Sequence, residues 1–259
     1  MRLNNNTILI TGGSRGIGLE LATQFLKLGN TVIITGRNQS KLDEVRRKFP
    51  ELHVFQSDVS NPGEIKFLFD AVTKQFPSLN VVVNNAGIMR KLNLHDRSMD
   101  LENINLEIAI NLSGPIRMVY QFLPFLKKQK DAAIMNVSSG LAFVPFPISP
   151  VYSATKAGIH FYTQSLRVQL KKTNIKVFEL APPLTNTDLQ NAFTPEDMKG
   201  TQAMETAKMV EYAIKGFGKN TLEIRPGPSN LLKIMSRLAP QFILNQMSKP
   251  VDNLLAQST

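Results

Sequence analysis

The chain has 259 residues, of which 42% are hydrophobic and 19% charged, and its 30 Lys and Arg exceed its 20 Asp and Glu to give a formal net charge of +10. This length and composition predict a folded protein with a large core and exclude disordered and fibrous classes. The absence of cysteine excludes disulfides, thiolate metal sites and cysteine nucleophiles. The three histidines, His53, His95 and His160, show no metal-ligand spacing, so we expect no metal centre.

The positive charge is compatible with nucleic acid, an anionic membrane surface or an anionic small molecule as partner. The densest cationic clusters, at 46–48 and 127–130, fall near predicted helix ends and fit solvated helix faces. No basic stripe with interleaved aromatics is present, so we do not expect a nucleic-acid partner. The N-terminal segment does not resemble a signal peptide and no apolar run approaches about 18 residues, so we expect a cytoplasmic protein.

Short β-rich runs alternate with helical patterns along the chain. Strands are predicted at 6–11, 31–35, 53–58, 80–87, 132–139, 175–180 and 221–225. Helices are predicted at 16–28, between the second and third strands up to about 48, at 62–76, at about 102–128, at about 151–171, and past Pro182 up to about 217. This alternation indicates one α/β domain with a parallel sheet covered on both faces.

A glycine-rich turn follows the first predicted strand. Gly12, Gly16 and Gly18 lie between that strand and the first helix. Glycine lets the backbone approach a pyrophosphate closely, and the N-terminus of the next helix offers free N–H groups. The spacing is GxxxGxG rather than the commoner GxGxxG, so the turn alone leaves open a tight turn without a ligand.

Two arginines bear on the choice of dinucleotide. The second strand ends in Gly36 and Arg37, where NAD-binding folds usually place an acid, and Arg15 lies inside the glycine turn. No acid occurs between Gly29 and Lys41. Two guanidinium groups suit a 2′-phosphate, so we expect NADP(H) rather than NAD(H) as the cofactor.

Six motifs in order make residues 6–225 resemble the short-chain dehydrogenase/reductase family: TGGSRGIG (11–18), SDV (57–59), NNAG (84–87), INLSG (110–114), NVSS (136–139) and YSATK (152–156). The chain is also similar to bacterial oxidoreductases encoded near D-alanylation operons. The resemblance implies a Rossmann-type doubly wound sheet of seven parallel strands, in the order 3-2-1-4-5-6-7. Residues 1–225 would then form the NADP-binding domain with the active site. Residues 226–259 would form a helical extension packed on the body or on a partner subunit.

The resemblance also assigns residues to the cofactor. Asp58 is expected near the adenine amine, and Lys156 is expected to hold the nicotinamide ribose. Thr185 and Thr187 would contact the carboxamide, on a loop stiffened by Pro183 where the family usually has glycine. The expected cofactor-binding residues are Gly12, Ser14, Arg15, Gly16, Ile17, Gly18, Arg37, Asp58, Val59, Asn85, Ala86, Gly87, Tyr152, Lys156, Pro182, Thr185 and Thr187.

The expected chemistry centres on Tyr152 and Lys156, which lie about one helical turn apart on one helix face. Tyrosine titrates near pH ~10, and a nearby ammonium favours its phenolate, so Lys156 is expected to lower the pKa of Tyr152. Ser139 ends a strand and can donate to a substrate carbonyl; Ser138 competes, but the thirteen-residue spacing to Tyr152 favours Ser139. By resemblance, Asn111 is the remaining catalytic residue and positions a water that relays protons to Lys156.

Two loops are predicted to enclose the substrate. Residues 188–205 would cover it with Phe193, Met198 and Met204, and residues 141–151 would line the opposite wall with Phe143, Phe146 and Pro147. An apolar or mixed substrate without strong charge is expected, although both loops could instead pack onto the body.

The C-terminal tail is predicted to form a helix from Ser229, its N-cap, to Met247, interrupted by Pro240. Three uses remain open for this helix. It could pack on the body or a partner subunit, it could form a lid over the site, or it could lie in a membrane interface using Lys233 and Arg237.

These observations favour an NADPH-dependent oxidoreductase that reduces a ketone or aldehyde to an alcohol, or catalyses the reverse, with Tyr152 as proton donor. The expected partners are a small carbonyl or alcohol substrate and further copies of the chain, as a homodimer or homotetramer. The alternative is a non-catalytic NADP(H)-binding sensor on the same fold. The set of Ser139, Tyr152 and Lys156 argues against that alternative, because a sensor has no need of it.

Overall fold

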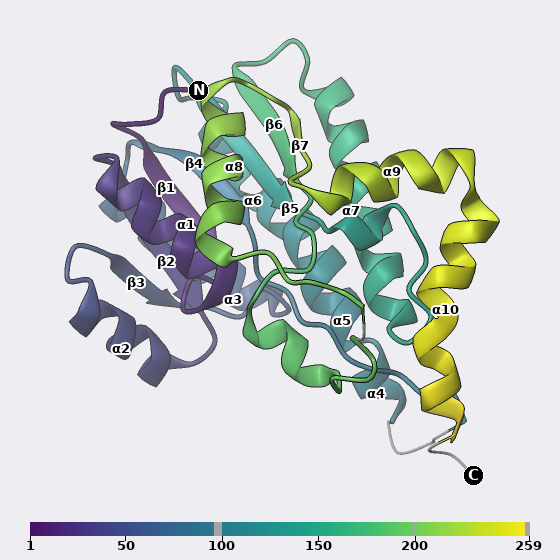
Figure 1. Cartoon of the computed structure of the whole chain (residues 1–259). Helices are drawn as coiled ribbons and strands as arrows, with labels where there is room; N and C mark the ends of the chain where they lie inside the picture. Colours follow the sequence, from purple (N-terminus) through teal and green to yellow (C-terminus); the bar gives the residue numbers. More distant parts are fainter. Residues whose placement is uncertain (96–99, 199, 257–259) are drawn as a thin grey trace.

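The computed structural model describes residues 1–95, 100–198 and 200–256 (Figure 1). Its strands are all parallel and form one sheet in the order β3-β2-β1-β4-β5-β6-β7. The strands are β1 (Thr7–Thr11), β2 (Thr31–Gly36), β3 (His53–Gln56), β4 (Leu79–Asn84), β5 (Ala132–Val137), β6 (Ile175–Leu180) and β7 (Glu223–Ile224). The predicted single-domain, doubly wound α/β fold and its strand order are confirmed.

Helices connect the strands and cover both faces of the sheet. They are α1 (Gly16–Lys27), α2 (Gln39–Lys48), α3 (Pro62–Gln75), α4 (Leu101–Ile104), α5 (Leu106–Ile108), α6 (Gly114–Leu126), α7 (Pro150–Gln169), α8 (Thr206–Gly218), α9 (Pro228–Leu238) and α10 (Pro240–Ala256). Three shorter segments are the π-helix η1 (Ala109–Ser113) and the 3-10 helices η2 (Gly140–Ala142) and η3 (Asp188–Ala192).

The central strands are buried on both faces because helices pack on each. Ile8 and Ile10 of β1 face a core shared with α1, α2 and α8, whereas Leu9 faces a second core shared with α3, α6 and α7. Successive side chains of a strand point to opposite faces, so the continuous apolar run at 8–10 fits a strand covered twice.

Asparagine caps fix the starts of two helices on the sheet's flanks. The Asn61 side chain accepts hydrogen bonds from the backbone N–H of Gly63 and Glu64, and Pro62 occupies the first turn of α3. Asn38 caps α2 in the same way through the N–H of Lys41. These caps satisfy backbone donors that a helix leaves free at its start.

The segments leading to the site depart from the predicted elements. β4 and β5 end at Asn84 and Val137, before the predicted ends at 87 and 139, because the chain beyond both strands turns to line a cavity. The single helix predicted at about 102–128 is broken, since η1 separates α5 from α6. A π-turn of this kind inserts an extra residue and often occurs at functional sites.

The tail forms two helices, α9 and α10, and the predicted interruption at Pro240 is confirmed. The predicted cap is wrong: α9 begins at Pro228 after Gly227, and Ser229 is buried inside its first turn. Residues 257–259 of the extension lie outside the described residues. No helix among the described residues is long and apolar enough to cross a membrane.

Candidate active site

Parallel strands end at the same edge of the sheet, and a cavity of about 890 Å³ opens there. Its floor is the glycine turn between β1 and α1. Gly12 has a positive φ of 65°, and a Cβ at this position would lie 2.8 Å from the Cα of Ala86. A Cβ on Gly18 would lie 2.3 Å from the carbonyl oxygen of Gly12, so any larger residue would push the turn and α1 apart.

The ends of β1 and β4 are tied together beside this turn. The Thr11 hydroxyl accepts hydrogen bonds from the backbone N–H of Asn85 at 3.0 Å and of Ala86 at 3.1 Å. In return, the Asn85 amide donates to the carbonyl oxygens of Thr11 and Gly12. The Asn85 side chain therefore holds the shape of the cavity floor.

The two arginines predicted to select NADP(H) both line the cavity. Arg15 pairs with Asp188 at 3.0 Å, and the two side chains are 56% and 55% exposed. Arg37 lies 3.9 Å from Asp58, whose other oxygen accepts hydrogen bonds from the N–H and hydroxyl of Ser60. Both guanidinium groups keep exposed surface for an anionic group.

Sequence reasoning missed three polar residues at the same end of the cavity, namely Asn38, Lys41 and Ser57. Lys41 adds a third cation beside the arginines. The Ser57 hydroxyl is buried and has no hydrogen-bond partner among the described residues. A buried hydroxyl normally has a partner, so this one fits a site that receives a polar ligand.

The residues present therefore fit a phosphorylated dinucleotide. The turn has no Cβ to obstruct a pyrophosphate, and the N-terminus of α1 points into the cavity through Gly16, Ile17 and Gly18. Cations and one orphaned hydroxyl lie at one end, and the predicted catalytic side chains lie at the other.

Tyr152, Lys156 and Ser139 meet at that other end of the cavity. Lys156 is buried, donates a hydrogen bond from Nζ to the carbonyl oxygen of Val137 at 2.9 Å, and lies 5.5 Å from the centre of the Tyr152 ring. The Ser139 hydroxyl accepts from the N–H of Leu141 and lies close enough to Tyr152 to hydrogen-bond its phenol.

Burial dominates the titration of this pair. It raises the pKa of Tyr152 to about 12, against a smaller lowering by the Ser139 hydroxyl and a further raising by the charge of Glu107. It lowers the pKa of Lys156 to about 8. The expected lowering of the Tyr152 pKa is therefore wrong for this structure, because desolvation of the phenolate raises the pKa by more than the Ser139 hydroxyl lowers it.

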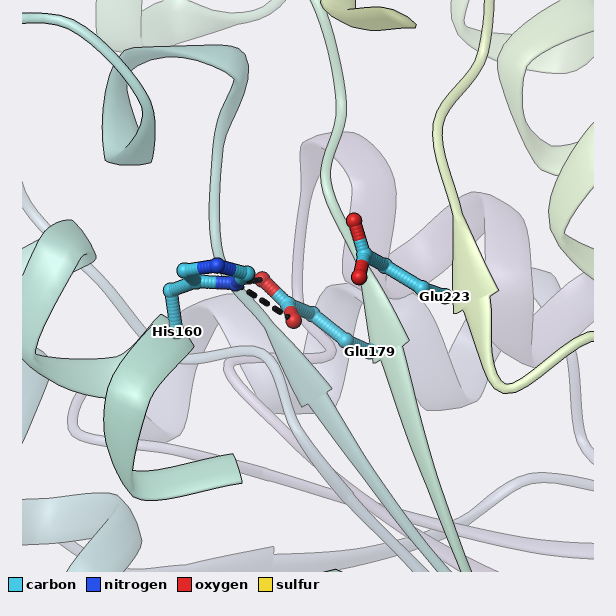
Figure 2. Close-up of side chains that lie close together, drawn as sticks. All are labelled: His160, Glu179 and Glu223. Atoms are coloured by element: carbon cyan, nitrogen blue, oxygen red, sulfur yellow. Dashed lines mark hydrogen bonds and ion pairs between the residues drawn. The ribbon is translucent and has the colours of Figure 1, made fainter. Parts of the chain in front are cut away.

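The structure separates the two candidate serines. The Ser138 hydroxyl donates to Oε1 of Glu179 at 2.6 Å, and the same carboxylate contacts Nδ1 of His160 at 2.9 and 3.0 Å (Figure 2). Ser138 is thus committed to a buried network behind the site, whereas Ser139 borders Tyr152.

Asn111 differs from the other predicted residues, because it lies in η1 and does not line the cavity. Its buried amide accepts from the N–H of Ile88 at 2.9 Å and donates to the carbonyl oxygen of the same residue at 2.8 Å. A Cβ on Gly87 would lie 3.3 Å from the Asn111 oxygen and 3.6 Å from Nζ of Lys156. Asn111 therefore holds the segment after β4 beside Lys156.

The loop after β6 closes the cavity at its centre. The carbonyl oxygen of Pro182 accepts from the N–H of Gly140 at 2.7 Å, and the Thr185 hydroxyl donates to the carbonyl oxygen of Pro183. Pro183 thus still serves as an acceptor although it lacks a backbone donor.

The substrate end is bounded by three segments. The rings of Phe146 and Phe193 lie 5.9 Å apart and join the two predicted walls. Asp197 is fully buried and pairs with Lys91 at 2.9 Å, which fastens the covering loop to the segment after β4. The third wall comes from the tail and was left open by the sequence; it consists of Pro228, Leu231, Leu232, Gln246, Met247, Lys249 and Pro250.

Apart from Asn111, every residue predicted for the cofactor or for catalysis lines this one cavity. Of the side chains predicted to enclose the substrate, Phe146, Phe193 and Met198 line the cavity, whereas Phe143, Pro147 and Met204 do not. The predicted covering segment 188–205 includes position 199, which lies outside the described residues.

The chain belongs to the short chain dehydrogenase family, whose model matches residues 6–198. It is 40% identical over 224 residues to an uncharacterized oxidoreductase of Bacillus subtilis called DltE, a match that covers 86% of this chain and 89% of the relative. It is 31% identical over 229 residues to an uncharacterized oxidoreductase of Staphylococcus aureus, covering 86% of this chain and 98% of the relative. The chain is therefore an oxidoreductase of this family and similar to DltE.

Solved structures agree on the fold. A short chain dehydrogenase from Burkholderia cenocepacia in complex with NADP matches with a TM-score of 0.82 at 21% identity, covering 95% of this chain and 99% of that one. A 3-ketoacyl-(acyl-carrier-protein) reductase from Brucella melitensis complexed with NADH matches with a TM-score of 0.76 at 25% identity, covering 83% and 91%. Relatives of this fold thus bind either NAD or NADP nucleotides.

Proposed function

We propose that the protein is an NADPH-dependent reductase of ketones or aldehydes, which also catalyses the reverse oxidation of the alcohol. The observation that carries this proposal is the meeting of Ser139, Tyr152 and Lys156 at the end of the cavity opposite Arg15 and Arg37. A dinucleotide bound with its phosphates on the glycine turn would extend from the arginines to these three side chains.

Reduction requires a hydride on the carbonyl carbon and a proton on its oxygen, and a bound reduced nicotinamide supplies the hydride. Tyr152 gives its phenolic proton to the oxygen, and its pKa of about 12 keeps that proton in place at neutral pH. Ser139 donates a hydrogen bond to the same oxygen. The Lys156 ammonium stabilises the phenolate that remains and holds the ribose hydroxyls. Asn111 supports proton return to Lys156, since both border Gly87.

Replacing Tyr152 with Phe tests the proton donor. We expect a loss of about 10²–10⁴-fold in kcat/KM, the usual contribution of a positioned acid, with NADPH affinity retained. The assay follows NADPH absorbance with a panel of aldehydes, ketones and diketones. Wild-type activity that survives in Tyr152→Phe would refute the assigned donor. Inactivity of the wild type across a broad panel, with tight NADPH binding, would favour the NADP(H)-binding sensor.

The preference for NADPH rests on the cations at the adenosine end of the cavity. Arg15, Arg37 and Lys41 line it, and the end of β2 carries no carboxylate that would repel a 2′-phosphate. Titration with both cofactors should give a lower Kd for NADPH, and Arg37→Ala should reduce that difference. Equal or tighter binding of NADH by the wild type would overturn the preference.

The walls of the substrate end favour an apolar carbonyl compound. Phe146, Phe193, Leu231 and Met247 surround it, and Asp197 is neutralised by Lys91. Activity should therefore rise with the apolar length of the substrate in the same panel.

We further propose that the protein is a homo-oligomer that associates through α6 and α7. Both helices cover the same face of the sheet, yet Tyr120 of α6 and Phe161 of α7 are 81% and 66% exposed. Exposed aromatic residues of this size are typical of interfaces. Light scattering of a Tyr120→Glu, Phe161→Glu variant should give the monomer mass. Phe67→Glu on α3, also at an exposed phenylalanine, should keep the wild-type mass.

A further inference from the structure

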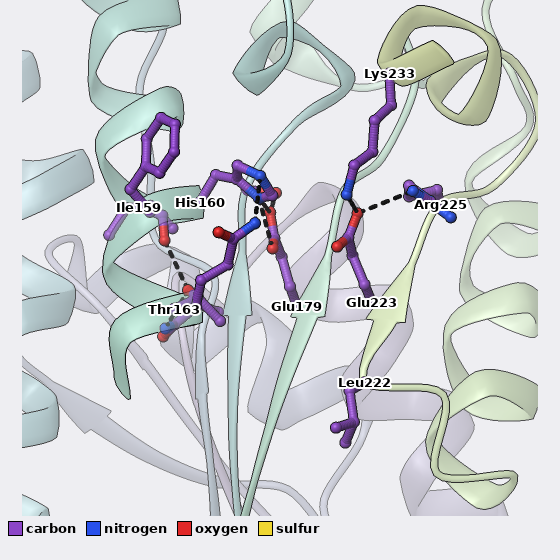
Figure 3. Close-up of polar contacts among 12 residues, drawn as sticks. Ile159, His160, Thr163, Glu179, Leu222, Glu223, Arg225 and Lys233 are labelled. Carbon is purple, nitrogen blue, oxygen red and sulfur yellow. Dashed lines mark hydrogen bonds and ion pairs between the residues drawn. The ribbon is translucent and has the colours of Figure 1, made fainter. Parts of the chain in front are cut away.

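Two glutamates face each other at the edge of the sheet. Glu179 of β6 and Glu223 of β7 are paired in the parallel register, so their side chains project from the same face (Figure 3). Like charges directly opposite one another destabilise a sheet unless each finds a cation. Glu179 is buried against His160, whereas Glu223 binds Lys233 and lies 3.1 Å from Arg225.

This cluster is organised for ion pairing rather than for a metal. Ligand atoms of His160, Glu179 and Glu223 lie within 4.8 Å of one another. However, Lys233 and Arg225 already neutralise Glu223, and the second ring nitrogen of His160 contacts Gln164 at 2.8 Å. A divalent cation would meet two positive side chains and a histidine whose nitrogens are both engaged.

Lys233 reaches this cluster from α9, in the tail. Its side chain is only 12% exposed, and its Nζ also lies 5.2 Å from the centre of the Phe143 ring. The pKa of Glu223 is lowered, with Lys233 the main favourable partner against the opposing effect of burial. Lys233 therefore fixes α9 to the edge of the sheet and is not free for a membrane surface, in contrast to the exposed Arg237.

A second contact seats α9 beside the catalytic serine. Ser229 is fully buried, and a Cβ on Gly140 would lie 2.9 Å from its hydroxyl and 3.2 Å from Leu232. Gly140 directly follows Ser139 and begins η2. The first turn of α9 thus packs on the segment that presents the proposed substrate hydroxyl donor.

The same tail supplies one wall of the cavity. Leu231 and Leu232 of α9 line it, as do Met247 and Pro250 of α10. Because α10 continues directly from α9 after a bend at Pro240, the position of α9 determines where the α10 part of the wall begins (Figure 1).

We propose that Lys233 is a positioning residue for substrate recognition: its ion pair with Glu223 seats α9 on the body and thereby sets the apolar cavity wall formed by α9 and α10. This inference rests on the proposed carbonyl-reductase function. A long apolar carbonyl substrate would contact this wall, whereas a short one would be held by Ser139 and Tyr152 alone. Lys233 would therefore affect the KM for long substrates more than the chemical step.

The test compares Lys233→Met, which keeps most of the side-chain volume, with Arg237→Met, which removes an exposed charge one turn further along α9. Kinetics with a short and a long aliphatic aldehyde are measured together with NADPH affinity. Hydrogen–deuterium exchange over residues 228–256 gives a readout that does not depend on turnover. Lys233→Arg tests rescue by a conserved charge, and Glu223→Gln removes the partner.

We expect Lys233→Met to raise the KM for the long aldehyde about tenfold, the usual effect of losing an apolar pocket contact, with kcat for the short aldehyde within about twofold of wild type. Exchange should increase across α9 and α10, with NADPH affinity retained. Glu223→Gln should behave alike, and Lys233→Arg and Arg237→Met should resemble wild type.

If hydrogen–deuterium exchange over residues 228–256 is unchanged in Lys233→Met, the proposal that Lys233 seats α9 on the body is overturned, whatever the kinetics show. If exchange is faster but the KM rises equally for both aldehydes, the proposal that Lys233 favours the binding of long substrates is overturned. If the wild type reduces none of the aldehydes, ketones and diketones of the panel, the proposed function fails, and the exchange data alone still decide whether Lys233 seats the tail. Retained NADPH affinity shows that each variant is folded.

Discussion

The two ends of the cavity are built in different ways. The cofactor end is formed where strands terminate, and it is held by hydrogen bonds between the Thr11 and Asn85 side chains and the backbone and by glycines that admit no Cβ. The substrate end is assembled from two loops and the tail, joined by single side-chain contacts such as Phe146 with Phe193 and Lys91 with Asp197. The cofactor site is thus built on rigid elements, whereas the substrate site is built from loops and a tail. Such segments can vary without disturbing the fold, so one fold can bind many substrates.

The largest expected effect lies where the two ends meet, at Lys156. Lys156→Met should reduce kcat/KM by at least about 10²-fold, because the Tyr152 phenolate would lose its neighbouring charge. The same change should stabilise the fold. Burial lowers the Lys156 pKa from 10.5 to about 8, and one pKa unit corresponds to about 1.4 kcal/mol, so removing the charge should raise the free energy of unfolding by up to roughly 3 kcal/mol at pH 7.

The sign of this effect can be checked by pH. The folded-state pKa of Lys156 lies below its unfolded value. The destabilisation caused by burying its charge is therefore present in full below pH 8 and disappears as the pH rises from about 8 to 10.5. The stability gap between Lys156→Met and wild type, from urea unfolding, should therefore narrow over that range. A gap that widens would contradict the assigned charge state. Wild-type reductase activity should fall as the pH passes about 8, where Lys156 of the folded protein loses its proton.

The next prediction compares alanine substitutions of two glycines, one at the cofactor end of the cavity and one at the substrate end. Gly18→Ala should abolish NADPH binding and destabilise the fold by about 1–3 kcal/mol, because its Cβ would overlap the Gly12 carbonyl. In Gly200→Ala, in the covering loop, the new Cβ meets no atom of the described residues beyond its chain neighbours within 4 Å, so this variant should lose only about 1 kcal/mol through its positive φ of 80°. Titration with NADPH and thermal unfolding distinguish them. Equal NADPH affinities in the two variants would show that the glycine turn can shift to admit a Cβ at position 18.

The same contrast governs what the sequence could predict. The cofactor end follows from local rules: Gly12, Gly16 and Gly18 sit at a strand–helix turn, and parallel strands share one edge. The position of Ser139 also follows, since strand ends meet there. The strand order and the single-domain fold could therefore be predicted from the sequence. The same holds for the motif residues that line the cavity.

The remaining features depend on tertiary packing. The helix pattern at 102–128 gave no sign of the π-turn that contains Asn111, nor of the hydrogen bonds that hold its amide against Ile88. The raised pKa of Tyr152 arises from burial, which a helical spacing cannot measure. The pairing of Glu179 with Glu223 needs the register of β6 and β7, so the route by which Lys233 anchors the tail was not visible in the chain.

At the substrate end, Phe193→Ala should open the covering loop without disturbing the cofactor. The variant loses the ring contact with Phe146, so the KM for a long apolar aldehyde should rise about tenfold while the Kd of NADPH stays within about twofold. Steady-state kinetics and cofactor titration measure the two quantities. Phe67→Ala, at an exposed position on α3, is the matched control and should change neither. A parallel loss of NADPH affinity would mean that the two ends are not independent.

The smallest expected effect concerns an ion pair that joins the glycine turn to the covering loop, Arg15 with Asp188. In Asp188→Asn the Arg15 guanidinium no longer has a carboxylate competing with a 2′-phosphate, so NADPH should bind more tightly and NADH should not. Exposed ion pairs contribute about 0–1 kcal/mol, which limits the gain to about fivefold. The difference should shrink at high salt, because both side chains are solvated. An equal gain for both cofactors would place the effect in the loop rather than at the phosphate, because only NADPH carries the group that Arg15 would then be free to bind.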